Sequence, residues 1–177
     1  MASTNSIAIQ EASNSPHVQK FMKQITNPIL QRLFLIGKLP SAFFMGIRIK
    51  SATPEEVQVT VPYGWRSQNP FKSIYFAAQA AAAEMSTGVL GQMALKGKGR
   101  VSMLIVKMEA EYTKKANKKT TFICKDGVKV FDAVARAIET GEGQTVDVES
   151  IGTQKGDNGE DVVVSRMKFT WSFKAKK

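Results

Sequence analysis

The chain has 177 residues, of which 43% are hydrophobic and 23% charged, and its formal net charge is +10. This length is enough for one domain with a real core, and no stretch approaches the roughly 18 consecutive apolar residues of a membrane span. The polar N-terminus lacks the basic start and apolar run of a signal peptide, so we expect a cytoplasmic protein.

One cysteine and one histidine limit the chemistry that the chain can carry. Cys124 excludes an internal disulfide, and together with His17 it leaves too few soft ligands for a Cys/His zinc site. Cys124 also lies in an apolar, strand-like run, which favours a buried, inert thiol over a nucleophile. We therefore expect no metal site and no other cofactor.

The N-terminal part of the chain divides into a polar start and a helical segment. Residues 1–14 are rich in Ser, Asn and Ala without a periodic pattern, which predicts disorder. Ser15-Pro16 and Asn27-Pro28 each combine an N-cap residue with a proline suited to the first helical position, so two short helices are expected within residues 15–40. This segment should pack on the domain or roof a pocket with its apolar residues, which include Ile29, Leu30, Leu33, Phe34 and Ile36.

Two short strands precede the longest helical signal of the chain. Apolar and polar residues alternate at residues 47–50 and again at 57–61, on either side of a turn at Thr53-Pro54. The helical signal then runs from Asn69, a suitable N-cap followed by proline, to Leu95. It contains six alanines between residues 77 and 83, which favour a helix but offer little volume, so this helix is built for close approach.

The remainder of the chain predicts a series of long strands. The pattern indicates a strand in which Val106, Met108, Ala110 and Tyr112 share one face, a strand at 120–124, an amphipathic helix at 128–140, a strand from 146, a hairpin turn at 156–159 and a last strand at 163–174. About six strands, mostly antiparallel, would curl around the one long helix, which is an α+β fold. With no internal repeat or linker, residues 15–177 are expected to form a single domain.

Basic residues cluster after the long helix and around one strand turn. A rim that faces phosphate groups and a solvated, solubilising surface are both compatible with this cluster, which comprises Lys96, Lys98, Arg100, Lys114, Lys115, Lys118 and Lys119. Aromatic residues are not interleaved with these positions, and no nucleic-acid-binding motif is present, so we expect no nucleic-acid partner.

The order of elements and two motifs resemble the hotdog fold. The segment from Asn69 to Glu84 resembles the signature of hotdog thioesterases of the phenylacetyl-CoA thioesterase type, which carry an asparagine before the helix and an Asp or Glu within it. Residues 107–116 resemble the third strand of that family. The resemblance covers roughly residues 42–174 and implies a curled antiparallel sheet wrapped around the helix, with an added N-terminal helical segment and an inserted helix at 128–140.

The resemblance implies an acyl-thioesterase and a set of site residues. Glu84 would act as general base, while Asn69, Ser73 and the amides around residues 72–74 would bind the thioester carbonyl. The implied substrate is an acyl-CoA or an acyl-carrier-protein thioester, and its binding residues would be Thr87, Lys96, Lys98, Arg100, Lys114 and Lys115. Because Ser73 and Glu84 lie about 16 Å apart along one helix, the family's side-by-side homodimer would build each site from two subunits, and dimers could pair into a tetramer.

The chain departs from the family signature at three places, which together comprise five residues. Pro70 replaces a histidine, Lys72 replaces a glycine, and residues 75–77 read Tyr-Phe-Ala where relatives have His-Gly-Gly. A non-catalytic protein that binds acyl-CoA or fatty acyl groups is therefore the alternative. Glu84 could then be a carboxylate in a polar niche, and Asn69 an N-cap alone.

Overall fold

The computed structural model describes residues 4–176, which form one six-stranded sheet and six helices. Every pair of neighbouring strands is antiparallel. The strand order is β1-β2-β4-β5-β6-β3, so β1 and β3 form the two edges. The strands are β1 (Arg48–Ala52), β2 (Val57–Val61), β3 (Val101–Tyr112), β4 (Thr120–Cys124), β5 (Gln144–Lys155) and β6 (Asp161–Ala175).

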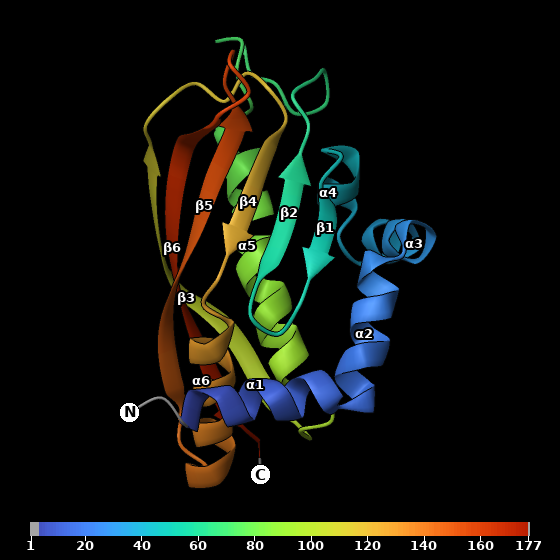
Figure 1. Ribbon diagram of the computed structural model, residues 1–177, viewed down its shortest axis with the longest axis vertical. Coiled ribbons are helices and arrows are strands. Elements are labelled where there is room, and N and C mark those ends of the chain that lie inside the picture. The colour runs from blue at the N-terminus through green and yellow to red at the C-terminus, as the bar shows by residue number, and fades with distance from the viewer. Residues whose placement is uncertain (1–3, 177) are drawn as a thin grey trace.

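The long helix α5 (Phe76–Ala94) lies across one face of this sheet (Figure 1). Its alanines at positions 78, 82 and 83 are fully buried and allow the helix axis to come close to β2, β4 and β5. The core between helix and sheet is completed by Phe122 from β4 and Phe169 from β6. This arrangement confirms the predicted α+β fold, in which an antiparallel sheet curls around one helix.

Four helices precede the sheet: α1 (Thr4–Asn14), α2 (Pro16–Thr26), α3 (Pro28–Lys38) and α4 (Pro40–Phe44). The two predicted cap-and-proline starts are confirmed, and the Asn27 side chain accepts hydrogen bonds from the backbone N–H groups of Ile29 and Leu30. The structure differs from the sequence prediction at residues 4–14, where a helix stands in place of disorder. Ile9 and Ala12 are buried there, because α1 lies against the inserted helix α6 (Gly127–Thr140). Residues 1–3 lie outside the described residues.

Helix α3 also differs from expectation. Its buried side chains are only Gln31 and Leu35, and Ile29, Leu33 and Ile36 face outward instead of packing on the domain. Leu30 and Phe34 are also exposed but border a small cavity against α2. The Gln31 amide donates to the carbonyl oxygens of Ile25 and Ile49, which fixes α3 to α2 and to β1. Packing of the N-terminal segment is therefore achieved mainly by α2, through Val18, Phe21 and Ile25.

The edge strand β3 is long and largely exposed. β6 pairs with one edge of β3, but no strand among the described residues pairs with its other edge. A bulge between Ile105 and Lys107 interrupts the alternation, so Val106 does not share the register of Met108 as the sequence suggested. No helix within residues 4–176 has the length and apolar character needed to cross a membrane.

Candidate active site

The chain between β2 and α5 forms a compact turn rather than the first turns of the helix. The sequence predicted a helix start at Asn69 and Pro70, but α5 begins at Phe76 with Tyr75 as its N-cap. The side-chain oxygen of Asn69 accepts hydrogen bonds from Phe71 N at 3.0 Å and from Ser73 N at 3.2 Å, as in an Asx turn. Lys72 then adopts a φ of +57°, which breaks the helical path.

The amide groups of this turn are used within the protein. Lys72 N donates to Asn69 O, Ser73 N donates to Asn69 Oδ1, and Ile74 N donates to Ala116 O at 2.7 Å. The Ser73 hydroxyl also donates to Asn69 Oδ1. Since Oδ1 receives these donors, the Asn69 amide Nδ2 is the polar group of this side chain that remains for a ligand.

The start of α5 carries free N–H groups one turn later. Tyr75 makes no side-chain capping bond, and within residues 4–176 no acceptor pairs with the backbone N–H of Phe76 or Ala77. The N-terminus of a 19-residue helix also carries a partial positive charge. This end of α5 is therefore suited to bind a carbonyl oxygen that becomes negatively charged.

An open cavity of about 870 Å³ lies at this end of the helix. It is formed by residues of the turn between Gln68 and Phe76, by Gln79 of α5, and by residues 112–116 at the end of β3. Asn69, Ser73, Lys114 and Lys115, four of the residues that the sequence identified as candidates, are thus brought together around one cavity.

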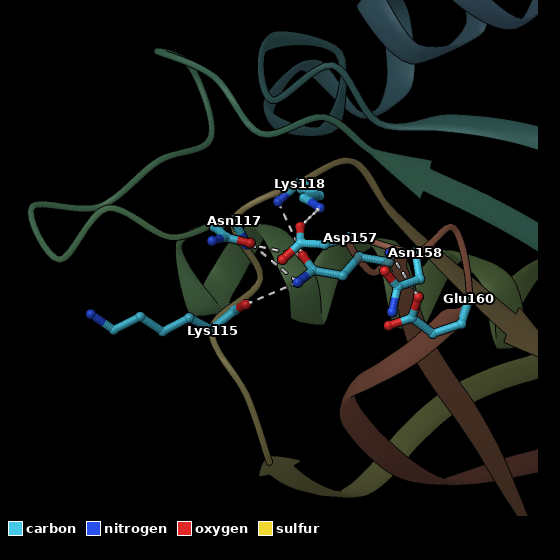
Figure 2. A network of polar contacts seen from close by, with 7 residues as sticks. Lys115, Asn117, Lys118, Asp157, Asn158 and Glu160 are labelled. Atoms are coloured by element: carbon cyan, nitrogen blue, oxygen red, sulfur yellow. Dashed lines mark hydrogen bonds and ion pairs between the residues drawn. The ribbon is translucent and has the colours of Figure 1, made fainter.

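A network of polar contacts holds the cavity wall that carries the two lysines (Figure 2). The Gln154 side chain accepts from the backbone N–H groups of Asn117 and Lys118 and donates to the carbonyl oxygen of Lys115. Lys118 forms an ion pair with Asp157 in the β5–β6 hairpin, with an Nζ to Oδ1 distance of 2.7 Å. Residues 115–118 are therefore fixed to the sheet, which keeps Lys114 and Lys115 at the cavity.

Gln79 is a cavity residue that sequence reasoning missed. It is buried, its amide Nε2 donates to Ile74 O, and its Oε1 accepts from the Ser165 hydroxyl of β6. It thus connects the turn, the helix and the sheet. The one signal in the sequence was a polar residue within an alanine-rich helix, a pattern that predicts a polar partner in the interior.

Glu84 lies two turns beyond the start of α5 and does not line the cavity. Its carboxylate is mostly buried, near Gly88 and close to the Trp171 ring that packs against that glycine. Burial raises the pKa of this carboxyl group, and no charged or hydrogen-bonding partner within residues 4–176 offsets the effect. A carboxylate with these properties is a candidate general base.

Thr87 has a structural role beside Glu84. Its hydroxyl donates to the carbonyl oxygen of Glu84 at 2.9 Å and accepts from the Trp171 indole N–H at 3.0 Å. The residue is fully buried, so it does not reach the cavity within one chain. Its contacts position Trp171 against the turn of α5 that bears Glu84.

The other basic candidates lie at the opposite end of α5. Lys96, Lys98 and Arg100 follow the last turn of the helix, about 28 Å from its start for 19 residues. Lys96 places its ammonium group 4.2 Å from the centre of the Phe21 ring. His17 also lies at this end, next to Gly97, and is therefore remote from the cavity.

Comparisons with known proteins identify the kind of fold that carries this cavity. Residues 30–172 match the model of a family described as a domain of unknown function, DUF4442. No match was found among curated proteins.

Solved structures resemble the chain over most of its length. A Chlorobaculum tepidum TLS protein of unknown function, OLEI01261, is 14% identical with a TM-score of 0.71, over 93% of this chain and 99% of that chain. The Pseudomonas aeruginosa protein PA5026, named as a probable thioesterase, is 18% identical with a TM-score of 0.68, over 86% and 99%. The Haemophilus influenzae thioesterase HI1161 is 11% identical with a TM-score of 0.53, over 91% and 92%. At these identities the likeness shows the fold, and the predicted hotdog fold is confirmed.

Proposed function

The chain belongs to the DUF4442 family, and on this premise we propose that it is a thioesterase that hydrolyses an acyl-CoA or acyl-carrier-protein thioester. One observation carries the proposal. The N-terminus of α5, whose first N–H groups are free, lies at a cavity bordered by two lysines. The same helix carries the mostly buried carboxylate of Glu84, which has no partner among the described residues. The hotdog thioesterase fold is consistent with this chemistry.

The proposed roles follow from the charge that each step of hydrolysis creates. The Glu84 carboxylate takes a proton from a water molecule, whose oxygen attacks the thioester carbonyl carbon. The N–H groups of Phe76 and Ala77 and the Asn69 amide Nδ2 donate to the resulting oxyanion, while Ser73 holds the Asn69 side chain in place. The C–S bond then breaks, and Glu84 returns the proton to the leaving thiolate.

We propose that two copies of the chain build each site, because Glu84 and the cavity are separated within one copy. Eight residues of helix place Glu84 about 12 Å beyond Phe76 along the axis. The unpaired edge of β3 is the surface through which a second copy can pair. Met108 and Tyr112 are exposed on the strand face that they share with their buried β6 partners, Phe169 and Ser165.

Antiparallel pairing of two β3 strands would also join the two basic groups. In such a pair the start of one strand meets the end of the other. The segment Lys96–Arg100, which precedes β3, would then approach Lys114 and Lys115 of the second copy, which follow it. The phosphate groups of coenzyme A or of a carrier-protein arm are the ligands that such a rim would bind.

The alternative function is acyl-CoA or fatty-acyl binding without turnover. The specific observation in its favour is the position of His17, which leaves the cavity without a histidine, while Pro70 and Phe76 occupy signature positions where relatives have other residues. A binding protein would need the same cavity and basic rim but not the Glu84 carboxylate.

Thiol release from a panel of acyl-CoA substrates tests the proposal directly. The panel should run from acetyl- to palmitoyl-CoA and include phenylacetyl-CoA, and the free thiol can be followed with an aromatic disulfide reagent. Cys124 does not interfere, since burial raises the pKa of its thiol to about 12. We expect turnover that Glu84→Gln reduces by about 10² to 10⁴-fold. Thermal stabilisation by acyl-CoA with no thiol release would instead support the binding protein.

A further inference from the structure

Helix α3 presents an apolar surface to solvent. At about 100° per residue, its outward-facing apolar side chains occupy a continuous arc of roughly 160°, while Gln31 and Leu35 face the protein. Leu33 is 63% exposed and Ile29 is 70% exposed, values that apolar residues of a packed helix do not show. The arc comprises Ile29, Leu30, Leu33, Phe34 and Ile36, and it continues into exposed Leu39 and Phe44.

Basic residues border this arc on both sides. On the same helical projection Arg32 lies at one margin of the arc and Lys38 at the other. The sequence from residue 12 to residue 54 contains no Asp or Glu at all, while it contains Lys20, Lys23, Arg32, Lys38, Arg48 and Lys50. The apolar surface thus lies in a purely cationic part of the chain, and its electrostatic complement is an anionic surface.

The position of α3 leaves this surface available. Figure 1 shows α3 beyond β1, at the margin of the molecule. Strand β3, whose free edge suits pairing with a second copy, is at the opposite edge of the sheet. A dimer formed through β3 would therefore leave α3 exposed.

We propose that α3, together with Leu39 and Phe44, binds to the surface of an anionic lipid membrane. The helix would lie in the plane of the interface, with its apolar arc among the upper acyl chains and with Arg32 and Lys38 at the phosphate groups of the lipids. Eleven residues, about 16 Å of helix, can lie in the interface but are too short to span a bilayer.

The chemistry of the surface favours lipid over a protein partner. The arc contains no hydrogen-bonding side chain between its two basic margins, and only Leu30 and Phe34, at one side of it, border a small cavity against α2. A protein interface of this kind needs a matching groove, whereas a bilayer accepts any exposed apolar helix face and adds anionic charge around it. The proposal is independent of the thioesterase function, because neither Glu84 nor the cavity takes part.

Vesicle co-sedimentation of the full-length protein tests this inference. The protein is mixed with vesicles of phosphatidylcholine alone or with about 30% phosphatidylserine, at low and at high salt. We expect binding that requires phosphatidylserine and weakens with salt. Leu33→Ser should reduce the partition coefficient about tenfold, and Arg32→Glu at least about fivefold.

Helix α6 offers matched control variants. Ile138→Ser and Arg136→Glu change exposed residues of the same types on a helix distant from α3, and they should leave vesicle binding unchanged. Melting temperatures of all four variants should stay close to that of the wild type, because every substituted side chain is exposed.

Three results would overturn the proposal. The first is wild-type protein that stays in the supernatant with phosphatidylserine vesicles at low salt. The second is an equal loss of binding in the α6 variants. The third is a smaller oligomer for Leu33→Ser in size-exclusion chromatography with no change in vesicle binding, which would assign α3 to a contact between copies of the chain.

Discussion

The carboxylate of Glu84 lies against Gly88, one helical turn further along α5, in space that a side chain at position 88 would fill. A Cβ atom at position 88 would lie 2.9 Å from Oε1 of Glu84 and 3.4 Å from the ring of Trp171. The Glu84 carboxylate thus lies between Gly88 and the region of the Trp171 ring, and Glu84 is mostly buried there. Burial there removes water from the carboxylate, and no charged or hydrogen-bonding partner among the described residues offsets this, so the pKa of Glu84 is raised.

The Gly88→Ala substitution should therefore separate activity from stability. The added methyl group displaces the end of a flexible side chain, so the fold is not strained, and alanine favours a helix by about 1 kcal/mol over glycine. We expect thiol release to fall about tenfold or more while the melting temperature holds or rises. In a Glu84→Gln background the same change should have no further effect on the rate, and an equal further loss would contradict a role through Glu84.

Glu84 should also make stability depend on pH. Because its pKa is higher in the folded protein than in the unfolded chain, its contribution to stability is complete below the unfolded pKa of about 4.3 and is lost as pH rises through the folded value. Glu84→Gln, which cannot ionise, should melt at a higher temperature than the wild type at pH 8. The difference should disappear near pH 4 in the same thermal scans.

An exposed glutamate provides the control for this comparison. Glu139→Gln, on the solvent face of α6, should leave the melting temperature unchanged at both pH values. A Glu84→Gln protein that melts below the wild type at pH 8 would show that the carboxylate makes a stabilising contact.

The free N–H of Phe76 can be removed without breaking the helix. Proline is well suited to the first helical position, and Tyr75, with a ψ of 136°, already has the extended conformation that a following proline requires. Phe76→Pro should lower kcat by about 10² to 10³-fold if this N–H binds the oxyanion. Phe76→Ala removes the ring and keeps the N–H, so steady-state kinetics of the two variants should differ by that factor. Equal rates would exclude Phe76 N as a donor.

The two lysines at the cavity should affect substrate binding more than chemistry. For the double variant Lys114→Ala, Lys115→Ala we expect KM for acyl-CoA to rise about tenfold with little change in kcat, because each substitution removes an ammonium group that attracts the phosphates of the substrate. The KM for an acyl-pantetheine without the nucleotide should hardly change. A similar rise for both substrates would indicate damage to the cavity wall instead of lost phosphate binding.

The fold was largely accessible from the sequence because the period of apolar residues is strong in the long elements. Three local patterns each determine one element, and the structure confirms all three: the apolar alternation gives β6, the alanines favour α5, and the Asn27 cap starts α3. The start of α5 was predicted six residues too early. Asn69 and Pro70 do have the chemistry of a helix start, but the residues after them form a loop. Ile74 N donates to the distant Ala116 O, and Tyr75 N donates to Ser67 O across the turn.

The site was accessible only in part. Asn69, Lys114 and Lys115 line one cavity, whereas Lys96 and Lys98 lie at the far end of the helix in the same chain. The roles proposed for them remain predictions. Gln79 and Gln154 could not be assigned from local pattern, since their roles depend on hydrogen bonds to Ser165 and to the loop after β3. The exposure of the apolar face of α3 was not predicted, because an apolar pattern in a helix does not show whether that face is buried or exposed to solvent.

Subunit complementation is the most direct test of a site shared between two copies. Glu84→Gln and Phe76→Pro chains, each carrying a different affinity tag, are co-expressed, and the mixed dimer is purified through both tags. One of its two sites then has an intact Glu84 from one chain and an intact Phe76 N–H from the other, so thiol release should recover to about half of the wild-type rate per dimer. A mixed dimer no more active than the two parent variants would contradict the account, because it would mean that each chain must supply both groups to its own site.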